Sequence, residues 1–321
     1  MLPQTTREKQ AVNHGALGDL CFHDNERGVP VSDTKPPTQE QSRPENEPES
    51  KVGSKRKTTA RPGTLKAGVT ELGEMSVLGG TVIWMAMRGP WDYWRDAMDQ
   101  MFAILKQCWI PMAVSCTFFG LGAPGLQGGN IYNLFGMPER LGSFFIMASI
   151  REFAPWVNAM VVAGVVGSAI TADLGARRIR DEIDAMEVLG VDPIRALALP
   201  RIIAVTIITG LLDVVALCFG TLGGFIAAVP ILGANPWAFY NNLFANLTTP
   251  DIWGSVVKTT LFGLIIGIVC CYKGMYAKGG AIGVGRAVNQ AVVIAFALIW
   301  VVNVVFTNIL LGLNPEIQVF K

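Results

Sequence analysis

Four ionisable side chains stand inside long apolar segments, where they could pair with one another, bind an ion or line a path for a polar group. They are Arg151, Glu152, Asp213 and Lys258. Ionisable groups at membrane depth are costly unless paired or hydrated, so they usually face a bundle interior or a cavity. For Arg151 and Glu152 two interpretations are equally open, a substrate cavity and an internal structural ion pair. Because neighbouring residues of a helix point about 100° apart, we expect the two side chains to have different partners.

The other two charges have simpler interpretations. Asp213 could accept a hydrogen bond where two helices pack against each other. Lys258 lies near the start of an apolar segment. We expect its ammonium group to reach the outer membrane interface while its methylene stem stays in the hydrocarbon layer.

A dense block of both charge signs, residues 171–201, separates two of the apolar segments. Its first part, residues 172–189, has the spacing of an amphipathic helix. Opposite charges four residues apart would support this helix, and they are Arg177 with Asp181, Arg178 with Glu182, and Arg180 with Asp184. Gly190 predicts the end of the helix, and Asp192–Pro193 predicts the start of another. A plain connector needs only a few residues, so a block this long favours a docking element over a solvated loop.

Enzymatic chemistry finds little support in the residue types. The chain lacks a G-x-x-x-x-G-K-[ST] phosphate-binding loop, so any ATP hydrolysis must come from a separate subunit. Both histidines, His14 and His23, fall in the polar N-terminal part, and the GLGAPG match at residues 120–125 follows no strand pattern. The six cysteines form no C-x-x-C pair. We therefore expect no catalytic residue, no metal ion and no cofactor.

The composition indicates a membrane protein. The chain is 51% hydrophobic and 16% charged, whereas soluble domains are about a quarter charged. Its net charge of +1 gives no electrostatic case for binding nucleic acid. Residues 1–66 are polar and poor in aromatic side chains, which predicts a disordered tail without a signal peptide. We expect residues 67–321 to form one membrane domain.

Five apolar runs are long enough to cross a hydrocarbon layer of about 30 Å. They are residues 103–122, 143–170, 202–229, 253–272 and 288–312. Residues 70–97 mix aromatic rings with charges, which predicts a helix lying in the membrane interface. Small residues four apart in the second run leave both tight packing within one subunit and a dimer face open; they are Ala163 with Gly167 and Gly164 with Ser168.

Loop charges predict the orientation of these runs. Arginine and lysine recur before the first run and in residues 171–201 and 273–287, whereas residues 123–142 hold one and residues 230–252 none. By the positive-inside rule, the N-terminal tail and the charged block lie in the cytoplasm and the C-terminus lies outside. We expect a multi-pass protein of the cell's inner (plasma) membrane.

Several motifs together carry a resemblance to a known family. They are IREFAP (150–155), AGVVGSAITADLG (163–175), RDEIDAMEVLGVDP (180–193), LALPRIIA (197–204), CYKGMYAKGG (271–280) and GVGRAVNQAVV (283–293). Over residues 70–315 the sequence resembles the MlaE/YrbE permeases, membrane subunits of ABC-type lipid transporters that work with MCE-domain proteins. It looks most like the A-type YrbE subunits of actinobacterial Mce systems. The tail lies outside the family core, and residues 120–140 match only loosely.

The resemblance implies an all-α integral membrane fold, MlaE-like, with one interfacial helix, five transmembrane helices and a cytoplasmic coupling helix. It implies a permease subunit, not an enzyme, that helps to move a lipid substrate across the cell envelope, in the import direction. The implied partners are membrane lipids, an MceG/MlaF-like ABC ATPase, MCE-domain proteins, and a second YrbE permease in a homodimer or an A/B heterodimer. A membrane scaffold that anchors MCE proteins without transport, and a lipid-modifying enzyme, remain alternatives.

The resemblance also implies two sets of site residues. The ATPase would dock on residues 172–193, with the apolar side chains in a groove of the ATPase and the charges fixing the register. The coupling residues are Arg180, Glu182, Ile183, Asp184, Met186, Leu189, Gly190, Asp192 and Pro193. The lipid cavity would be lined by Arg151 and Glu152.

Overall fold

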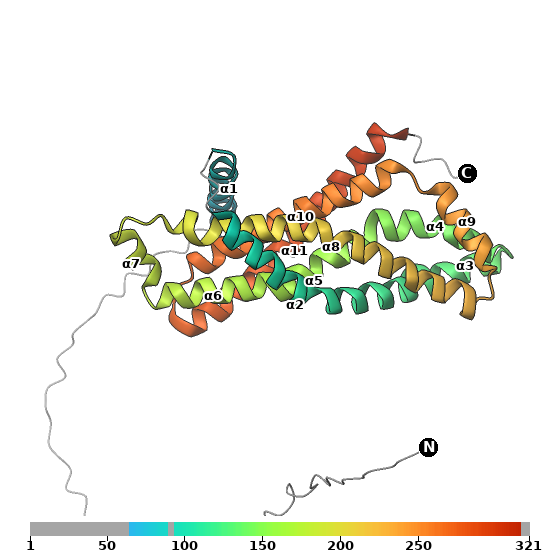
Figure 1. The fold of residues 1–321 in the computed structure, drawn as a ribbon, viewed down its shortest axis with the longest axis horizontal. Coiled ribbons are helices and arrows are strands. Elements are labelled where there is room, and N and C mark those ends of the chain that lie inside the picture. Colours follow the sequence, from blue (N-terminus) through green and yellow to red (C-terminus); the bar gives the residue numbers. More distant parts are fainter. Residues whose placement is uncertain (1–63, 89–92, 316–321) are drawn as a thin grey trace, which may run out of the picture. The chain divides into compact units, whose positions relative to one another are not determined.

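The computed structural model describes residues 64–88 and 93–315, and within these ranges every regular element is a helix (Figure 1). Five helical stretches in the described part are long and apolar enough to cross a membrane. They are Trp94–Leu134, Pro138–Ile179, Ile194–Ile231, Thr249–Met275 and Gly280–Leu313. The prediction of an all-α protein with five spans is confirmed, and the chain is a multi-pass membrane protein. The predicted disordered tail, residues 1–66, falls almost wholly outside the described residues.

The first three spans are built from several helical segments each. The first contains α2 (Trp94–Gly120), a π-helical turn and α3 (Gly128–Leu134). The second contains α4 (Leu141–Phe145), α5 (Ala154–Val162) and α6 (Ser168–Ile179), joined by π-helical segments. The third is α8 (Leu199–Ile226) with a π-helical segment at each end. The fourth and fifth spans are single helices, α10 (Thr249–Met275) and α11 (Gly280–Leu313).

Most spans extend well beyond the predicted apolar runs. The second span has 42 residues, Pro138–Ile179, whereas the predicted apolar run covered only residues 143–170. A helix rises 1.5 Å per residue, so about 20 residues cross the hydrocarbon layer. This stretch is therefore about twice as long as an untilted crossing of the layer requires.

The predicted interfacial helix at residues 70–97 is two elements. Helix α1 runs from Thr64 to Arg88, and Trp94 already belongs to α2. In the sequence Gly89 and Pro90 follow Arg88, and a residue before proline disfavours the helical conformation. Figure 1 shows α1 running across the direction of the long helices. Its buried side chains recur at helical spacing, at Met75, Leu78 and Val82.

Helix α8 forms the centre of the bundle and packs closely against α2 and α10. Small residues make the close approach possible, since a Cβ atom on Gly223 would lie 2.2 Å from the carbonyl oxygen of Thr117. The two small-residue pairs of the second span have different surroundings. A Cβ on Gly167 would lie 2.8 Å from Cys270 Sγ, whereas Gly164 has no atom of the chain near it. The Ala163–Gly167 face is therefore used within the subunit, and the face of Gly164 stays open.

A second, smaller core lies at one end of the bundle, where α4 packs against α9 (Pro236–Asn246). Phe239 and Leu243 of α9 are buried together with Leu141 of α4. The side-chain oxygen of Asn235 accepts hydrogen bonds from the first backbone N–H groups of α9, which fixes where that helix begins.

Candidate functional site

Two groups of polar residues stand out in the bundle. The first group, called the polar network below, lies between the second, fourth and fifth spans and joins side chains far apart in the sequence. Its members are Arg151, Glu152, Asp251, Lys258, Asn303 and Thr307. The second group, called the charged turn, comprises residues 173–201, from Asp173 of α6 to Arg201 of α8.

A π-helical segment, Ile146–Phe153, presents Arg151 and Glu152 to the polar network. Such segments are frequent at functional sites because the wider turn redirects side chains. Pro155 follows directly and has no N–H to donate to the carbonyl oxygen of Arg151, its normal helical acceptor. Lys258 Nζ donates a hydrogen bond to that oxygen at 2.8 Å. The proline thus leaves the carbonyl oxygen of Arg151 without its helical donor, and Lys258 of α10 donates the hydrogen bond instead.

Glu152 is the centre of the polar network. Its carboxylate accepts hydrogen bonds from Asn303 Nδ2 and Thr307 Oγ1, both at 2.6 Å, and lies 3.5 Å from Lys258 Nζ. Asn303 and Thr307 are four residues apart on α11 and so share one helix face. The side chain of Glu152 remains 35% exposed, whereas that of Lys258 is 2% exposed. The side chain of Glu152 is therefore partly exposed, whereas that of its cation is buried.

Arg151 turns to a different partner, as expected from the helix geometry. Its Nε lies 2.7 Å from Asp251 Oδ1 at the start of α10. The other oxygen of Asp251 accepts from the backbone N–H and the hydroxyl of Thr248, a capping box that begins this helix. Of the two interpretations left open for Arg151 and Glu152, the internal ion pairs are present in the structure.

The expectation for Lys258 was wrong, and the one for Asp213 is confirmed. Lys258 does not reach the interface, because the carboxylate of Glu152 and the hydroxyl of Thr307 lie within hydrogen-bonding range inside the bundle. Asp213 of α8 is fully buried, and its Oδ2 accepts a hydrogen bond of 2.6 Å from Ser255 of α10. Asp213 therefore joins two packed helices.

The charged turn differs from the predicted continuous helix 172–189. Helix α6 ends at Ile179, Asp181 adopts a left-handed conformation with φ 57°, and a separate helix α7 runs from Glu182 to Val188. The physical reason is the burial of Ile183, which is 2% exposed and belongs to the main core. A straight helix would carry this side chain away from the bundle, so the chain reverses before it.

The break also replaces the predicted ion pairs, which were wrong. Arg177 pairs with Asp173 and Glu182 instead of Asp181. Arg178 pairs with Asp184, and Arg180 with Glu182 at 2.8 Å. Asp173 also pairs with Arg201 of α8 at 2.5 Å. These contacts tie the end of the second span to the start of the third.

The predicted helix end at Gly190 and the predicted new start at Asp192–Pro193 are both confirmed. Gly190 has φ 79°, and the N–H groups of Gly190 and Val191 donate to the carbonyls of Glu187 and Met186. This pattern is a Schellman motif, whose left-handed residue is usually glycine and sometimes asparagine. Asp192 then accepts a hydrogen bond from the backbone N–H of Ile194, and Pro193 immediately precedes the next helical segment. Hydrogen bonds therefore fix the backbone on both sides of Val191.

The tip of the charged turn is apolar and exposed. Val188 is 88% exposed and Leu189 79% exposed, and Val191 is also exposed. Ile183 was expected to contact a partner, but the chain itself buries it, while Met186 is half-buried. Val188 and Val191 were missed from the sequence, although their position around Gly190 at the end of α7 was visible. An exposed apolar tip on a braced charged turn is suited to contact another protein.

Within the described ranges, no group of three or more His, Cys, Asp and Glu side chains could hold a metal ion. The GLGAPG match forms part of a helical segment, in which a Cβ on Gly125 would lie 2.6 Å from the carbonyl oxygen of Gly120. The helical bundle, its polar network and its braced turn thus define an all-α, multi-pass membrane protein.

Comparison with known proteins agrees with this class. The model of the family described as Permease MlaE matches residues 97–309, so the chain belongs to the MlaE permease family. A protein named a probable ABC transporter permease, from Rickettsia typhi, is 33% identical over 201 residues, which are 63% of this chain and 78% of that protein. A protein of the same description from Synechocystis is 30% identical over 209 residues, 65% of this chain and 79% of that one.

A plant protein is also similar. The chloroplastic protein TRIGALACTOSYLDIACYLGLYCEROL 1 of Arabidopsis thaliana is 27% identical over 232 residues, 72% of this chain and 66% of the plant protein. The chain is therefore a permease of the kind found in ABC transporters of bacteria, with relatives that extend to plastids.

Proposed function

We propose that this chain is the transmembrane permease subunit of an ABC-type Mce lipid transporter. A separate ABC ATPase hydrolyses ATP, and the permease uses the resulting motion to move lipid across the cell envelope, in the import direction. The observation that carries the proposal is the charged turn, which presents exposed Val188 and Leu189 on a frame tied to the second and third spans. An ATPase bound to this tip would therefore move the second and third spans together.

The coupling works through the contacts of the charged turn. Val188 and Leu189 enter an apolar groove of the ATPase, and Arg180, Glu182 and Asp184 set the register. Met186, Gly190, Asp192 and Pro193 hold the tip in shape, and Ile183 anchors it to the core. Nucleotide binding changes the state of the permease only through contacts that differ between the two states. The tip is where such contacts are made.

The lipid passes beside the polar network. Arg151 and Glu152 line the lipid cavity, which forms between this permease and a second one in a homodimer or an A/B heterodimer. The partly exposed side chain of Glu152 gives the cavity wall a polar group among apolar side chains. MCE-domain proteins receive or deliver the lipid on the outer side.

The orientation follows the loop charges. Residues 1–66 and the charged turn lie in the cytoplasm, α1 lies in the inner leaflet interface, and the C-terminus lies outside the plasma membrane. The EIDAMEVLGVDP motif supports the Mce subtype, and the relatives from rickettsiae, a cyanobacterium and a plant support the broader permease family. A non-transporting scaffold that anchors MCE proteins is the second candidate, favoured by the same apolar tip.

Reconstitution separates the two candidates. The permease is co-expressed with its ATPase and partner permease and placed in liposomes, and a labelled lipid is supplied on a soluble MCE protein. We expect ATP-dependent transfer of the label from the MCE protein to the liposomes, and none with an ATPase that binds but cannot hydrolyse ATP. Transfer that is the same with the active and the inactive ATPase would support the scaffold instead.

A further inference from the structure

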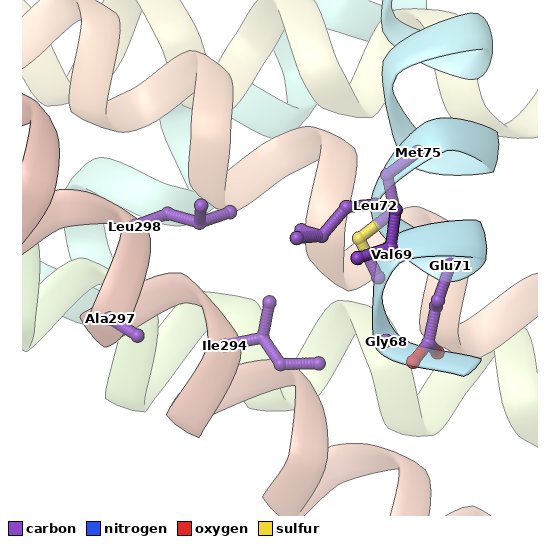
Figure 2. Close-up of a pocket in the computed structure, with 8 residues that line it drawn as sticks. All are labelled: Gly68, Val69, Glu71, Leu72, Met75, Ile294, Ala297 and Leu298. Carbon is purple, nitrogen blue, oxygen red and sulfur yellow. The ribbon is translucent and has the colours of Figure 1, made fainter. Parts of the chain in front are cut away.

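An apolar groove separates α1 from α11, away from the polar network and the charged turn. In Figure 2, Ile294 and Leu298 of α11 point across a gap toward Val69 and Leu72 of α1. The gap is a cavity of about 480 Å³, within the size range of sites for small molecules. Its other lining residues are Gly68, Glu71, Met75 and Ala297. Apart from the carboxylate of Glu71, the side chains offer only apolar atoms.

A polar pocket adjoins this groove and shares Glu71 with it. The pocket has a volume of about 360 Å³, and its charged lining consists of three basic side chains, Lys273, Lys278 and Arg286, and two carboxylates, Glu71 and Glu74. Glu74 accepts a hydrogen bond from the hydroxyl of Tyr272. Lys273 is occupied, because it pairs with Glu71 and donates to Gln290 Oε1 at 3.1 Å. Lys278 and Arg286 are exposed and pair with no carboxylate of the described residues. Two cations are therefore left for a ligand at the end of an apolar slot.

We propose that this groove binds one glycerophospholipid, with an acyl chain between α1 and α11 and the phosphate between Lys278 and Arg286. This lipid is distinct from the lipid that is transported. The two pockets match the two halves of such a molecule, an apolar chain and an anionic phosphate. Basic side chains at the membrane surface attract anionic headgroups. The leaflet it comes from, the cytoplasmic one, rests on the orientation given under the proposed function.

The dimensions of the groove favour a lipid over a second protein. On α11 the lining runs only from Ile294 to Leu298, little more than one helical turn. A helix with its side chains is about 10 Å across and would need a groove that continues along α11. Met75 is buried and closes one side of the slot. A flexible hydrocarbon chain fits such a short slot, whereas a partner helix does not.

Photo-crosslinking tests the proposal directly. The full-length permease complex is placed in nanodiscs of phosphatidylcholine and phosphatidylglycerol, with a trace of phosphatidylglycerol that carries a diazirine in its acyl chain. We expect the label on peptides that contain Leu72 and Ile294. The substitution Ala297→Phe fills the slot and should reduce this label about tenfold, in line with the loss of a buried chain. The matched control Val305→Phe changes an exposed apolar position on the same helix, outside the slot, and should leave the label unchanged.

A second variant tests the contact with the lipid headgroup and changes no core residue. Lys278→Ala with Arg286→Ala alters two exposed side chains and should lower the labelling by the phosphatidylglycerol probe about tenfold. Labelling that is spread evenly along the exposed face of α11 and unchanged by Ala297→Phe would overturn the proposal. Crosslinks from the slot to a second protein chain would also overturn it.

These outcomes are independent of transport. The crosslinking requires neither ATP nor lipid transfer, so a permease that failed the reconstitution assay could still show the labelled groove. Orientation is read separately, by labelling a Lys278→Cys variant with a membrane-impermeant thiol reagent from each side. Reaction from the outer side would remove the assignment to the cytoplasmic leaflet.

Discussion

The ammonium group of Lys258 and the carboxylate of Glu152 both bond to the same hydroxyl group, that of Thr307. Lys258 Nζ donates to Thr307 Oγ1 at 2.8 Å, and this hydroxyl donates to Glu152 Oε1 at 2.6 Å. The two charges thus contact each other directly, and the hydroxyl of Thr307 on the fifth span also connects them. Their removal should therefore have effects that depend on each other, because each charge is stabilised by the other.

Lys258→Met should destabilise the protein. It leaves the carboxylate of Glu152 without its cation, and because this side chain is 35% exposed the cost should lie below the about 3–5 kcal/mol of a fully buried pair. The double variant Lys258→Met with Glu152→Gln removes both charges and should recover much of the loss. Thermal unfolding in detergent measures both variants. Equal melting temperatures for the single and the double variant would contradict the coupling.

Gly223→Ala should destabilise the contact between α2 and α8. The added Cβ would lie 2.2 Å from the carbonyl oxygen of Thr117, so the two helices must move apart. Overpacking of this kind costs about 1–3 kcal/mol. The control is Gly122→Ala, at a helical glycine with no chain atom near its Cβ position, which should be neutral or slightly stabilising. Chemical denaturation compares the two, and equal stability would refute the close approach.

Val188→Asp with Leu189→Asp should abolish co-purification of the ATPase. Both side chains are exposed at the tip of the charged turn, so the variant should still fold and reach the membrane. Buried unpaired carboxylates in an apolar groove of the partner would be strongly unfavourable. Leu134→Asp, at the exposed last residue of the first span, is the control and should retain the ATPase. Normal recovery of the ATPase with the tip variant would remove the docking assignment.

Gly190→Val should weaken ATPase binding without a change at any contact residue. Its φ of 79° is poorly tolerated by a β-branched side chain, so the Schellman motif that shapes the tip would be lost. Gly190→Asn, which tolerates this conformation better, should retain most of the binding. Pull-down of the ATPase at several concentrations measures the difference. Equal binding by both variants would mean that the shape of the tip is unimportant.

The apolar runs predict the five spans because burial in lipid needs only length and composition. The partners inside the bundle depend on which helix faces meet, and this is tertiary information. Asn303 and Thr307 were missed, although their spacing of four in an apolar run is a signal that they share one face. Asp251 was also missed, although Thr248 and Asp251 have the spacing of a capping box.

The end of α6 at Ile179 carried no such signal. Neither glycine nor proline stands there, and the charges four residues apart argue for a continuous helix. The helix ends there because Ile183 is buried against the bundle. The packing of this one apolar side chain outweighs exposed ion pairs of well under about 1 kcal/mol each. Local patterns therefore predicted the helix end at Gly190 and the new start at Asp192–Pro193, but not the break after Ile179.

The length of the second span has a mechanical consequence. Its 42 residues, Pro138–Ile179, are helical from the small core around α4 to the charged turn. At 1.5 Å per residue this lever arm is about 60 Å long, so a rotation of about 5° around its middle would shift each end by about 2–3 Å in opposite directions. A small stroke at one surface of the membrane would thus reappear, reversed in sign, at the other.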